Sequence, residues 1–109
     1  MKKRIAILGS TGSIGASALQ VIAEHPAHFE VTGLAAHSNI ERLAAQARAC
    51  RPRRIAVWEP ARAAALRTAL AGAPIEVLDG VEGLTALATD SACDVVLLAT
   101  SGVAGLRPL

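Results

Sequence analysis

A glycine-rich segment near the amino end holds residue types that can bind phosphate. Residues 9–15 read GSTGSIG and follow the apolar run at residues 5–8. Glycine lets the backbone adopt positive φ and lets a ligand approach without a Cβ in the way. The helix that the following residues predict would offer unpaired N–H groups and the positive end of its dipole. The segment therefore predicts a phosphate-binding turn between a strand and a helix.

The glycine spacing is a variant of the dinucleotide-binding fingerprint. Gly12 and Gly15 match the second and third glycines of G-x-G-x-x-G, whereas Gly9 lies one residue early. A Walker A loop is excluded because the Lys-Ser/Thr ending is missing. We expect Gly15 to allow close packing of the helix on the strand. The loop also offers hydroxyl donors without added charge, from Ser10, Thr11 and Ser13. A glycine-rich turn that serves packing alone is the alternative interpretation.

A second loop, after the apolar segment at residues 29–36, bears on the choice of cofactor. NAD-binding proteins carry an acidic residue about 20 positions after the glycines, but here the chain reads His37, Ser38 and Asn39. Neutral donors and a nearby cation, Arg42, suit a 2′-phosphate. His37 is close enough to contact the adenosine end. The loop therefore predicts NADP(H) over NAD(H), although Ser38 and Asn39 could also only cap the next helix.

The elements that must position these loops alternate along the chain. Strands are predicted at residues 5–8, 29–36, 54–58, 75–78 and 94–99. Helices are predicted at residues 13–24, 40–49, 61–71 and 81–89, the third opened by Pro60 and closed by Gly72. This alternation predicts a Rossmann-like doubly wound parallel sheet in a three-layer α/β/α architecture. Ligands of such sheets bind beyond the carboxyl ends of the strands.

Composition limits the other classes of function. Hydrophobic residues make up 52% of the 109 residues and aromatic residues only 2%, so the core must consist of Ala, Val, Ile and Leu. A net charge of +2 is too small to indicate a nucleic-acid partner. The run at residues 5–8 is too short for a signal core or a membrane span. Cys50 and Cys93 match no metal or redox spacing and favour a reducing, cytoplasmic location. No catalytic set and no metal site is visible.

Three segments carry a resemblance to a known family: GSTGSIG, HFEVTGLAAHSN and the terminal GVAGLRPL. With these, the chain closely resembles the amino-terminal domain of the 1-deoxy-D-xylulose 5-phosphate reductoisomerases. The resemblance implies NADPH-dependent rearrangement and reduction of that sugar phosphate to 2-C-methyl-D-erythritol 4-phosphate, in non-mevalonate isoprenoid biosynthesis. It also implies Mg²⁺ or Mn²⁺ as a second cofactor, and a homodimer.

The resemblance assigns roles by position. The residues implied to hold the pyrophosphate are Thr11, Gly12, Ser13 and Ile14. The residues implied to hold the 2′-phosphate end of adenosine are His37, Ser38 and Asn39. Residues 99–102 would border the nicotinamide. Metal ligands and the substrate-phosphate site are implied to lie beyond Leu109. We therefore expect residues 1–109 to form an incomplete NADP(H)-binding domain without activity of its own.

Two alternatives stay open at this point. Semialdehyde dehydrogenases and acyl-phosphate reductases also open with G-x-x-G-x-x-G and prefer NADP, but they use a cysteine nucleophile further along the chain. A nucleotide-binding module without catalysis is the second alternative. The uncapped terminal residues 105–109 favour a longer protein over such a module.

Overall fold

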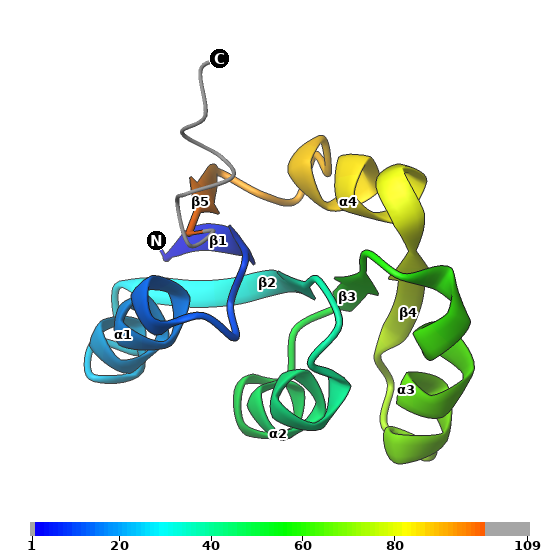
Figure 1. The fold of residues 1–109 in the computed structure, drawn as a ribbon. Coiled ribbons are helices and arrows are strands. Elements are labelled where there is room, and N and C mark those ends of the chain that lie inside the picture. Colours follow the sequence, from blue (N-terminus) through cyan, green and yellow to red (C-terminus); the bar gives the residue numbers. More distant parts are fainter. Residues whose placement is uncertain (1, 100–109) are drawn as a thin grey trace.

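Five parallel strands form one sheet in this protein (Figure 1). The structure, a computed structural model, describes residues 2–99. The strands are β1 (Lys3–Leu8), β2 (Phe29–Ala36), β3 (Arg54–Val57), β4 (Glu76–Asp79) and β5 (Val95–Leu98). The helices are α1 (Ser13–Ala23), α2 (Ile40–Cys50), the 3₁₀ turn η1 (Pro60–Arg62), α3 (Ala63–Ala69) and α4 (Gly80–Ala88).

The strand order reverses beside β1. The order across the sheet is β4-β3-β2-β1-β5, so the chain moves outward from β1 to β4 and then returns to the far side of β1. Helices α1, α2 and α3 cover one face, and α4 covers the other on the return (Figure 1). This is the predicted doubly wound, three-layer arrangement, which is confirmed. In such sheets the ligand crevice lies where the strand order reverses.

Alternation of side chains along the strands builds a separate core on each face of the sheet. In β3, Ile55 and Val57 pack toward α2 and α3, whereas Ala56 packs toward Leu87 of α4. Branched apolar side chains fill the first core, and alanine lets α4 approach the second. The core of Ala, Val, Ile and Leu that the composition predicts is confirmed.

Some element boundaries differ from the sequence prediction. The third helix is divided because the amide of Arg62 bonds back to the carbonyl of Glu59, which makes its first turn a tighter 3₁₀ turn. Strand β4 begins at Glu76, one residue late, because the amide of Ile75 is used in a turn to Ala73. Helix α3 ends at Ala69 with Leu70 as its cap, two residues before the predicted end, and Gly72 takes φ of 90° in the turn that follows.

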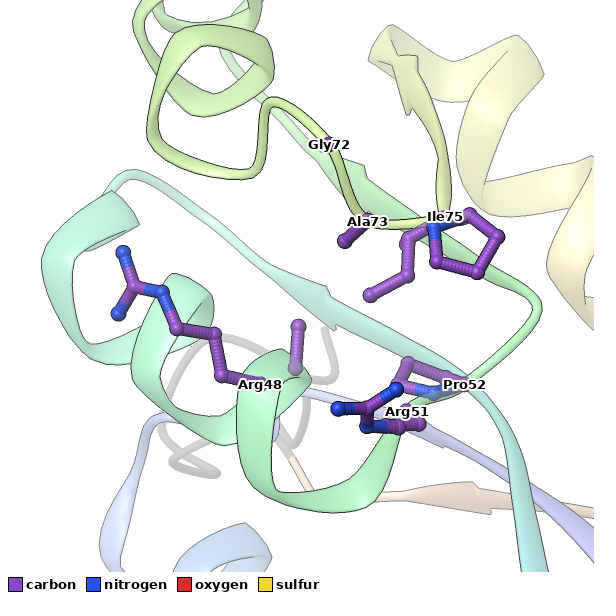
Figure 2. Close-up of a pocket in the computed structure, with 8 residues that line it drawn as sticks. Arg48, Arg51, Pro52, Gly72, Ala73 and Ile75 are labelled. Carbon is purple, nitrogen blue, oxygen red and sulfur yellow. The ribbon is translucent and has the colours of Figure 1, made fainter.

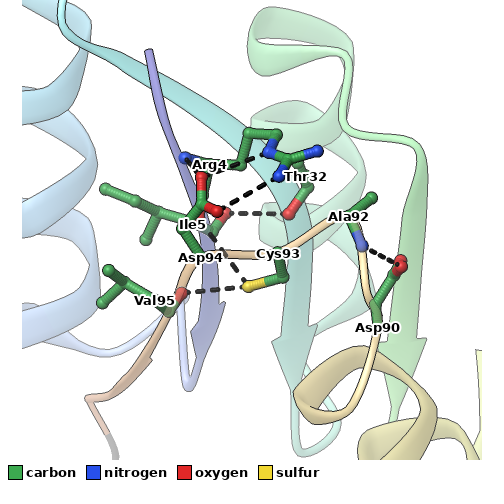
Figure 3. Close-up of polar contacts among 8 residues, drawn as sticks. All are labelled: Arg4, Ile5, Thr32, Asp90, Ala92, Cys93, Asp94 and Val95. Atoms are coloured by element: carbon green, nitrogen blue, oxygen red, sulfur yellow. Dashed lines mark hydrogen bonds and ion pairs between the residues drawn. The ribbon is translucent and has the colours of Figure 1, made fainter. Parts of the chain in front are cut away.

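A four-bond contact joins the starts of β1 and β5 (Figure 3). The carboxylate of Asp94 accepts from the backbone amide of Arg4 at 2.8 Å and from its Nε and Nη2 at 3.1 Å each. The Asp94 amide donates to the Arg4 carbonyl at 2.8 Å. These hydrogen bonds from Arg4 lower the pKa of Asp94 from 3.8 to about 2. The contact fixes β5, the last strand in the chain, beside the first.

We expect Asp94→Asn to lower stability at neutral pH and to flatten its acid dependence. The folded pKa of Asp94 lies below its unfolded value, so the unfolded state binds more protons and stability falls as pH drops from about 4 to about 2. The variant lacks this titrating carboxylate. Urea unfolding midpoints across this range measure the effect, with the exposed Glu24→Gln as control. An unchanged slope in Asp94→Asn would contradict the prediction.

Strand β5 leaves apolar side chains exposed. Val95 and Val96 are exposed, and Leu98 is 71% exposed. Within residues 2–99 no helix combines the length and the apolar character that crossing a bilayer demands.

Candidate functional site

A cavity of about 620 Å³ opens at the carboxyl ends of the strands. The loop after β1 contributes Gly9, Thr11 and Gly12 to its wall, the end of β2 contributes His37, and the end of β3 contributes Trp58. Its apolar surface includes Leu8, Leu84 and Leu98. We call it the carboxyl-end cavity. Its volume is within the range of about 300–1,000 Å³ that small-molecule sites occupy, and it borders the strand pair where the sheet order reverses.

The loop after β1 is fastened to β2 by its backbone. Gly9 takes φ of 93°, a conformation that favours glycine. The amides of Gly9 and Ser10 both donate to the carbonyl of Ala35, at 2.8 and 2.9 Å. The amide of Gly12 makes a longer turn bond of 3.3 Å to the Gly9 carbonyl. These bonds hold the loop at the cavity wall.

The first turn of α1 leaves backbone donors free. Gly12 precedes the helix, and its carbonyl accepts the first helical bond from Ala16 at 2.9 Å. Among residues 2–99, the amides of Thr11, Ser13 and Ile14 find no protein acceptor. The first turn carries no acidic side chain. The loop therefore meets both requirements of an anion site, an open cavity and unoccupied amides at a helix start.

Gly15 sets how closely α1 approaches β1. A Cβ built at Gly15 would lie 2.7 Å from the Cα of Ser10 and would overlap the carbonyl oxygen of Gly9. The predicted close helix–strand packing is confirmed. Gly12 differs, since a Cβ there would meet its nearest atom at 3.7 Å.

The prediction that Ser10 offers its hydroxyl to a ligand is wrong. Ser10 is 0% exposed, and its Oγ donates to Oε1 of Gln46 at 2.8 Å. In return, Nε2 of Gln46 donates to the Ser10 carbonyl at 2.8 Å. Sequence reasoning missed Gln46, although a polar residue beside the apolar stripe of α2 was a signal. These two hydrogen bonds between Ser10 and Gln46 hold the loop after β1 against α2.

Some of the polar groups in the loop after β2 form hydrogen bonds that cap α2. Oδ1 of Asn39 accepts from the Arg42 amide at 3.1 Å, which confirms the predicted cap. The Ile40 amide donates to the Ser38 carbonyl at 2.9 Å. The backbone amides of Ile40 and Arg42 are therefore occupied and are not available to a ligand. The Ser38 hydroxyl and the Asn39 side-chain amide donate to no acceptor among the described residues.

The structure places the carboxylate of Glu59 near the loop after β2, a contact that the sequence analysis did not predict. His37 stacks on Trp58, with ring centroids 6.2 Å apart and planes at 22°. Its Nδ1 lies 4.0 Å from Oε2 of Glu59. The other oxygen, Oε1 of Glu59, accepts from Nε of Arg62 at 2.7 Å. The residues that directly follow β2 include no carboxylate. The carboxylate of Glu59, which follows β3, is partly neutralised by Arg62.

Of residues 99–102, only Ala99 is among the described residues. It is buried, lines the carboxyl-end cavity and donates its amide to the Leu8 carbonyl at 2.8 Å. Across the described range 2–99, no three His, Cys, Asp or Glu side chains gather closely enough to hold a metal ion.

A second cavity, of about 340 Å³, lies near the amino ends of β3 and β4 (Figure 2). It is bounded by the loops that lead into β3 and β4, with Arg48 and Arg51 on one side and Gly72 and Ile75 on the other. Arg48 already donates to the carbonyl of Ala69 at 3.1 Å. Because parallel α/β sheets bind ligands at the carboxyl ends of their strands, the carboxyl-end cavity is the candidate site.

Comparison with known proteins adds relatives of this chain. Residues 5–109 match the family described as 1-deoxy-D-xylulose 5-phosphate reductoisomerase. The protein of that name from Trichlorobacter lovleyi is 48% identical over 106 residues, which cover 97% of this chain and 27% of the relative. A crystal structure of DOX-P reductoisomerase with NADPH, fosmidomycin and magnesium superposes with a TM-score of 0.82 at 38% identity. The superposed residues cover 86% of this chain and 23% of the reductoisomerase chain.

The reductoisomerase from Zymomonas mobilis in complex with NADPH is a further structural relative. It superposes with a TM-score of 0.78 at 32% identity, over 81% of this chain and 23% of its own. This chain thus spans about a quarter of the length of the relatives it matches.

Proposed function

Because the chain belongs to the 1-deoxy-D-xylulose 5-phosphate reductoisomerase family, we propose that it forms the NADPH-binding part of such an enzyme. The whole protein would rearrange 1-deoxy-D-xylulose 5-phosphate and reduce the product to 2-C-methyl-D-erythritol 4-phosphate. The observation that carries the proposal is the set of unoccupied amides at the start of α1, which open onto the carboxyl-end cavity. At this position the pyrophosphate of a dinucleotide could accept hydrogen bonds from these amides, and no carboxylate lies in the first turn of α1.

Four residues at the start of α1 would hold the pyrophosphate: Thr11, Gly12, Ser13 and Ile14. The amides of Thr11, Ser13 and Ile14 are the free donors, and the helix dipole adds positive potential. Gly12 leaves room for a close approach, since nothing lies within 3.7 Å of the position its Cβ would take. The adjacent Gly9–Ala35 and Ser10–Gln46 bonds keep these donors in place before the ligand arrives.

The 2′-phosphate of the adenosine would lie at the tip of β2, held by His37, Ser38 and Asn39. A hydroxyl, a side-chain amide and an imidazole supply donors there, with Arg42 one turn away. Asn39 can cap α2 with its oxygen and still offer its Nδ2. These features favour NADPH over NADH, because β2 itself ends without an acidic side chain that would bind a ribose 2′-hydroxyl. The carboxylate of Glu59, 4.0 Å from Nδ1 of His37, is paired with Arg62.

NADPH supplies the hydride for the reduction, and the described residues bind and orient it. The Mg²⁺ or Mn²⁺ ligands and the sugar-phosphate site would lie beyond Leu109, as membership of the family implies. The 109-residue chain is then one cofactor domain, inactive alone because hydride transfer needs substrate and nicotinamide in contact. We further propose a cytoplasmic homodimer for the whole enzyme. Family membership argues against a semialdehyde dehydrogenase.

The cofactor assignment is tested by Asn39→Asp. Aspartate caps a helix as well as asparagine does, so α2 and the fold stay intact while a carboxylate enters the proposed 2′-phosphate subsite. We expect wild type to bind NADPH at least 10-fold more tightly than NADH. In Asn39→Asp the NADPH affinity falls by on the order of 10-fold, through like-charge repulsion worth about 1.4 kcal/mol, while NADH affinity holds or rises. Calorimetric titration measures both.

The control is Glu24→Gln, which changes an exposed charge beyond the end of α1 and should leave both affinities unchanged. Equal loss of NADPH and NADH affinity in Asn39→Asp would mean that Asn39 does not face the 2′-phosphate. Wild type that binds neither nucleotide would overturn the cofactor proposal itself.

A further inference from the structure

The carboxyl-end cavity is lined by a tryptophan, Trp58, that has no role in the binding of the two phosphate groups. Trp58, directly after β3, is the only tryptophan in the chain and is 41% exposed. Its backbone is held in place, because its amide donates to the Ala36 carbonyl at 2.9 Å. Trp58 lines the cavity, and the His37 ring lies nearly parallel to its ring, with centroids 6.2 Å apart. A large apolar ring left half open at a fixed position inside a cavity offers a flat surface for a flat ligand.

We propose that Trp58 is the stacking platform for the adenine ring of the dinucleotide and so determines affinity for the adenosine half. This inference rests on the proposed function, since it assumes that a dinucleotide occupies the carboxyl-end cavity. Every nucleobase has a π-face, and stacking on an aromatic side chain is a principal source of base affinity. Trp58 is the residue in the described part of the cavity that offers the largest such face.

The strand order gives the direction in which the dinucleotide lies. The free amides stand at the tip of β1, the polar residues His37 to Asn39 at the tip of β2, and Trp58 at the tip of β3. Neighbouring strands are about 4.8 Å apart, so Trp58 lies about 10 Å across the sheet from the β1 loop. The 2′-phosphate and the adenine are attached to the same ribose. A ribose over β2 therefore extends its base toward β3 and Trp58.

The opposite half of the dinucleotide points away from Trp58. From the pyrophosphate at β1, the nicotinamide half extends toward β5, where Ala99 and Leu98 line the cavity. Loss of the Trp58 ring should therefore weaken the adenosine half and leave the nicotinamide half unaffected. A residue that merely covers the core would not separate the two halves in this way.

The test uses the 109-residue chain and two probes, adenosine 2′,5′-bisphosphate and reduced nicotinamide mononucleotide. Trp58 is the sole tryptophan and the chain has no tyrosine, so its fluorescence reports this site alone. We expect adenosine 2′,5′-bisphosphate, which has no nicotinamide to absorb the emission, to change that fluorescence in a saturable way. By calorimetry, Trp58→Ala should bind this probe on the order of 10-fold more weakly, and Trp58→Phe within about 3-fold of wild type.

Controls separate stacking from folding and from the wider proposal. Val21→Ala removes another exposed apolar side chain, on α1 and outside the cavity, and should bind like wild type. Circular dichroism checks that each variant is folded. If Trp58→Ala does not fold, the fluorescence of wild type decides: adenosine 2′,5′-bisphosphate that binds without changing the Trp58 emission overturns the platform. Equal affinity of adenosine 2′,5′-bisphosphate for wild type, Trp58→Phe and Trp58→Ala overturns the platform while the proposed function stands. Wild type that binds neither this probe nor NADPH overturns both.

Discussion

Gly15→Ala is expected to abolish tight dinucleotide binding and to destabilise the fold. The added Cβ would stand 2.7 Å from the Cα of Ser10 and would overlap the Gly9 carbonyl. Both obstacles are backbone atoms, and that backbone is fastened to Ala35 by two hydrogen bonds. Either α1 moves away from β1 or the loop shifts, and each change misaligns the free amides at the start of α1. Overpacking of this kind costs about 1–3 kcal/mol, which exceeds the roughly 1 kcal/mol that alanine gains in helix propensity.

Two matched glycine variants separate the causes of that loss. Gly83→Ala creates a similar clash in α4, where the Cβ would lie 2.9 Å from the Leu78 Cβ, on the face of the sheet opposite α1. It should lower stability and leave NADPH affinity nearly unchanged while the chain is folded. Gly12→Ala has room for its methyl group, so it should keep stability and lose affinity if the pyrophosphate approaches closely.

Urea unfolding and calorimetric NADPH titration measure both quantities for the three variants. A loss of at least 10-fold in affinity is expected for Gly15→Ala at temperatures where circular dichroism finds it folded. Wild-type affinity in a folded Gly15→Ala would show that the spacing of α1 and the loop does not control binding. Equal affinity losses in Gly83→Ala and Gly15→Ala would assign the effect to general destabilisation.

The sequence predicted the backbone of this fold well because its signals are local. Apolar runs such as residues 29–36 and the cap at Asn39 act over a few residues, so the strand and the helix start lie where predicted. Gly9 and Gly15 were also predictable, since a strand-to-helix turn restricts both positive φ and close packing to glycine. The winding followed from the alternation of strands and helices.

Side-chain partners across the sheet could not be predicted in the same way. Ser10 and Gln46 are 36 residues apart, and Arg4 and Asp94 are 90 apart, so no local pattern connects them. Ser10 has the same residue type as an exposed phosphate-binding serine, and only the position of α2 shows that its hydroxyl points into the protein. The approach of Glu59 to His37 likewise depends on β3 lying beside β2. Strand order, rather than residue type, decides these contacts.

Gln46→Leu is the second variant with a large expected effect, because Gln46 acts on the cofactor loop from outside the cavity. Leucine keeps the volume of the side chain but removes both bonds to Ser10, which is 0% exposed. A buried hydroxyl and a carbonyl then lack partners, at a cost of about 1–3 kcal/mol in unfolding free energy. The neighbouring amides lose their fixed position, so NADPH affinity should fall by on the order of 10-fold.

A double-mutant cycle tests whether Gln46 acts through Ser10. In Ser10→Ala the hydroxyl is already absent, so adding Gln46→Leu should cost less than the sum of the two single changes, with a coupling of about 0.5–3 kcal/mol. The matched control is Gln20→Leu, since Gln20 is the other glutamine of the chain and is exposed on α1. It should leave stability and affinity unchanged. Strict additivity of Ser10→Ala and Gln46→Leu in both measurements would mean that the bonds do not position the loop, and that its hold on β2 through Ala35 is sufficient.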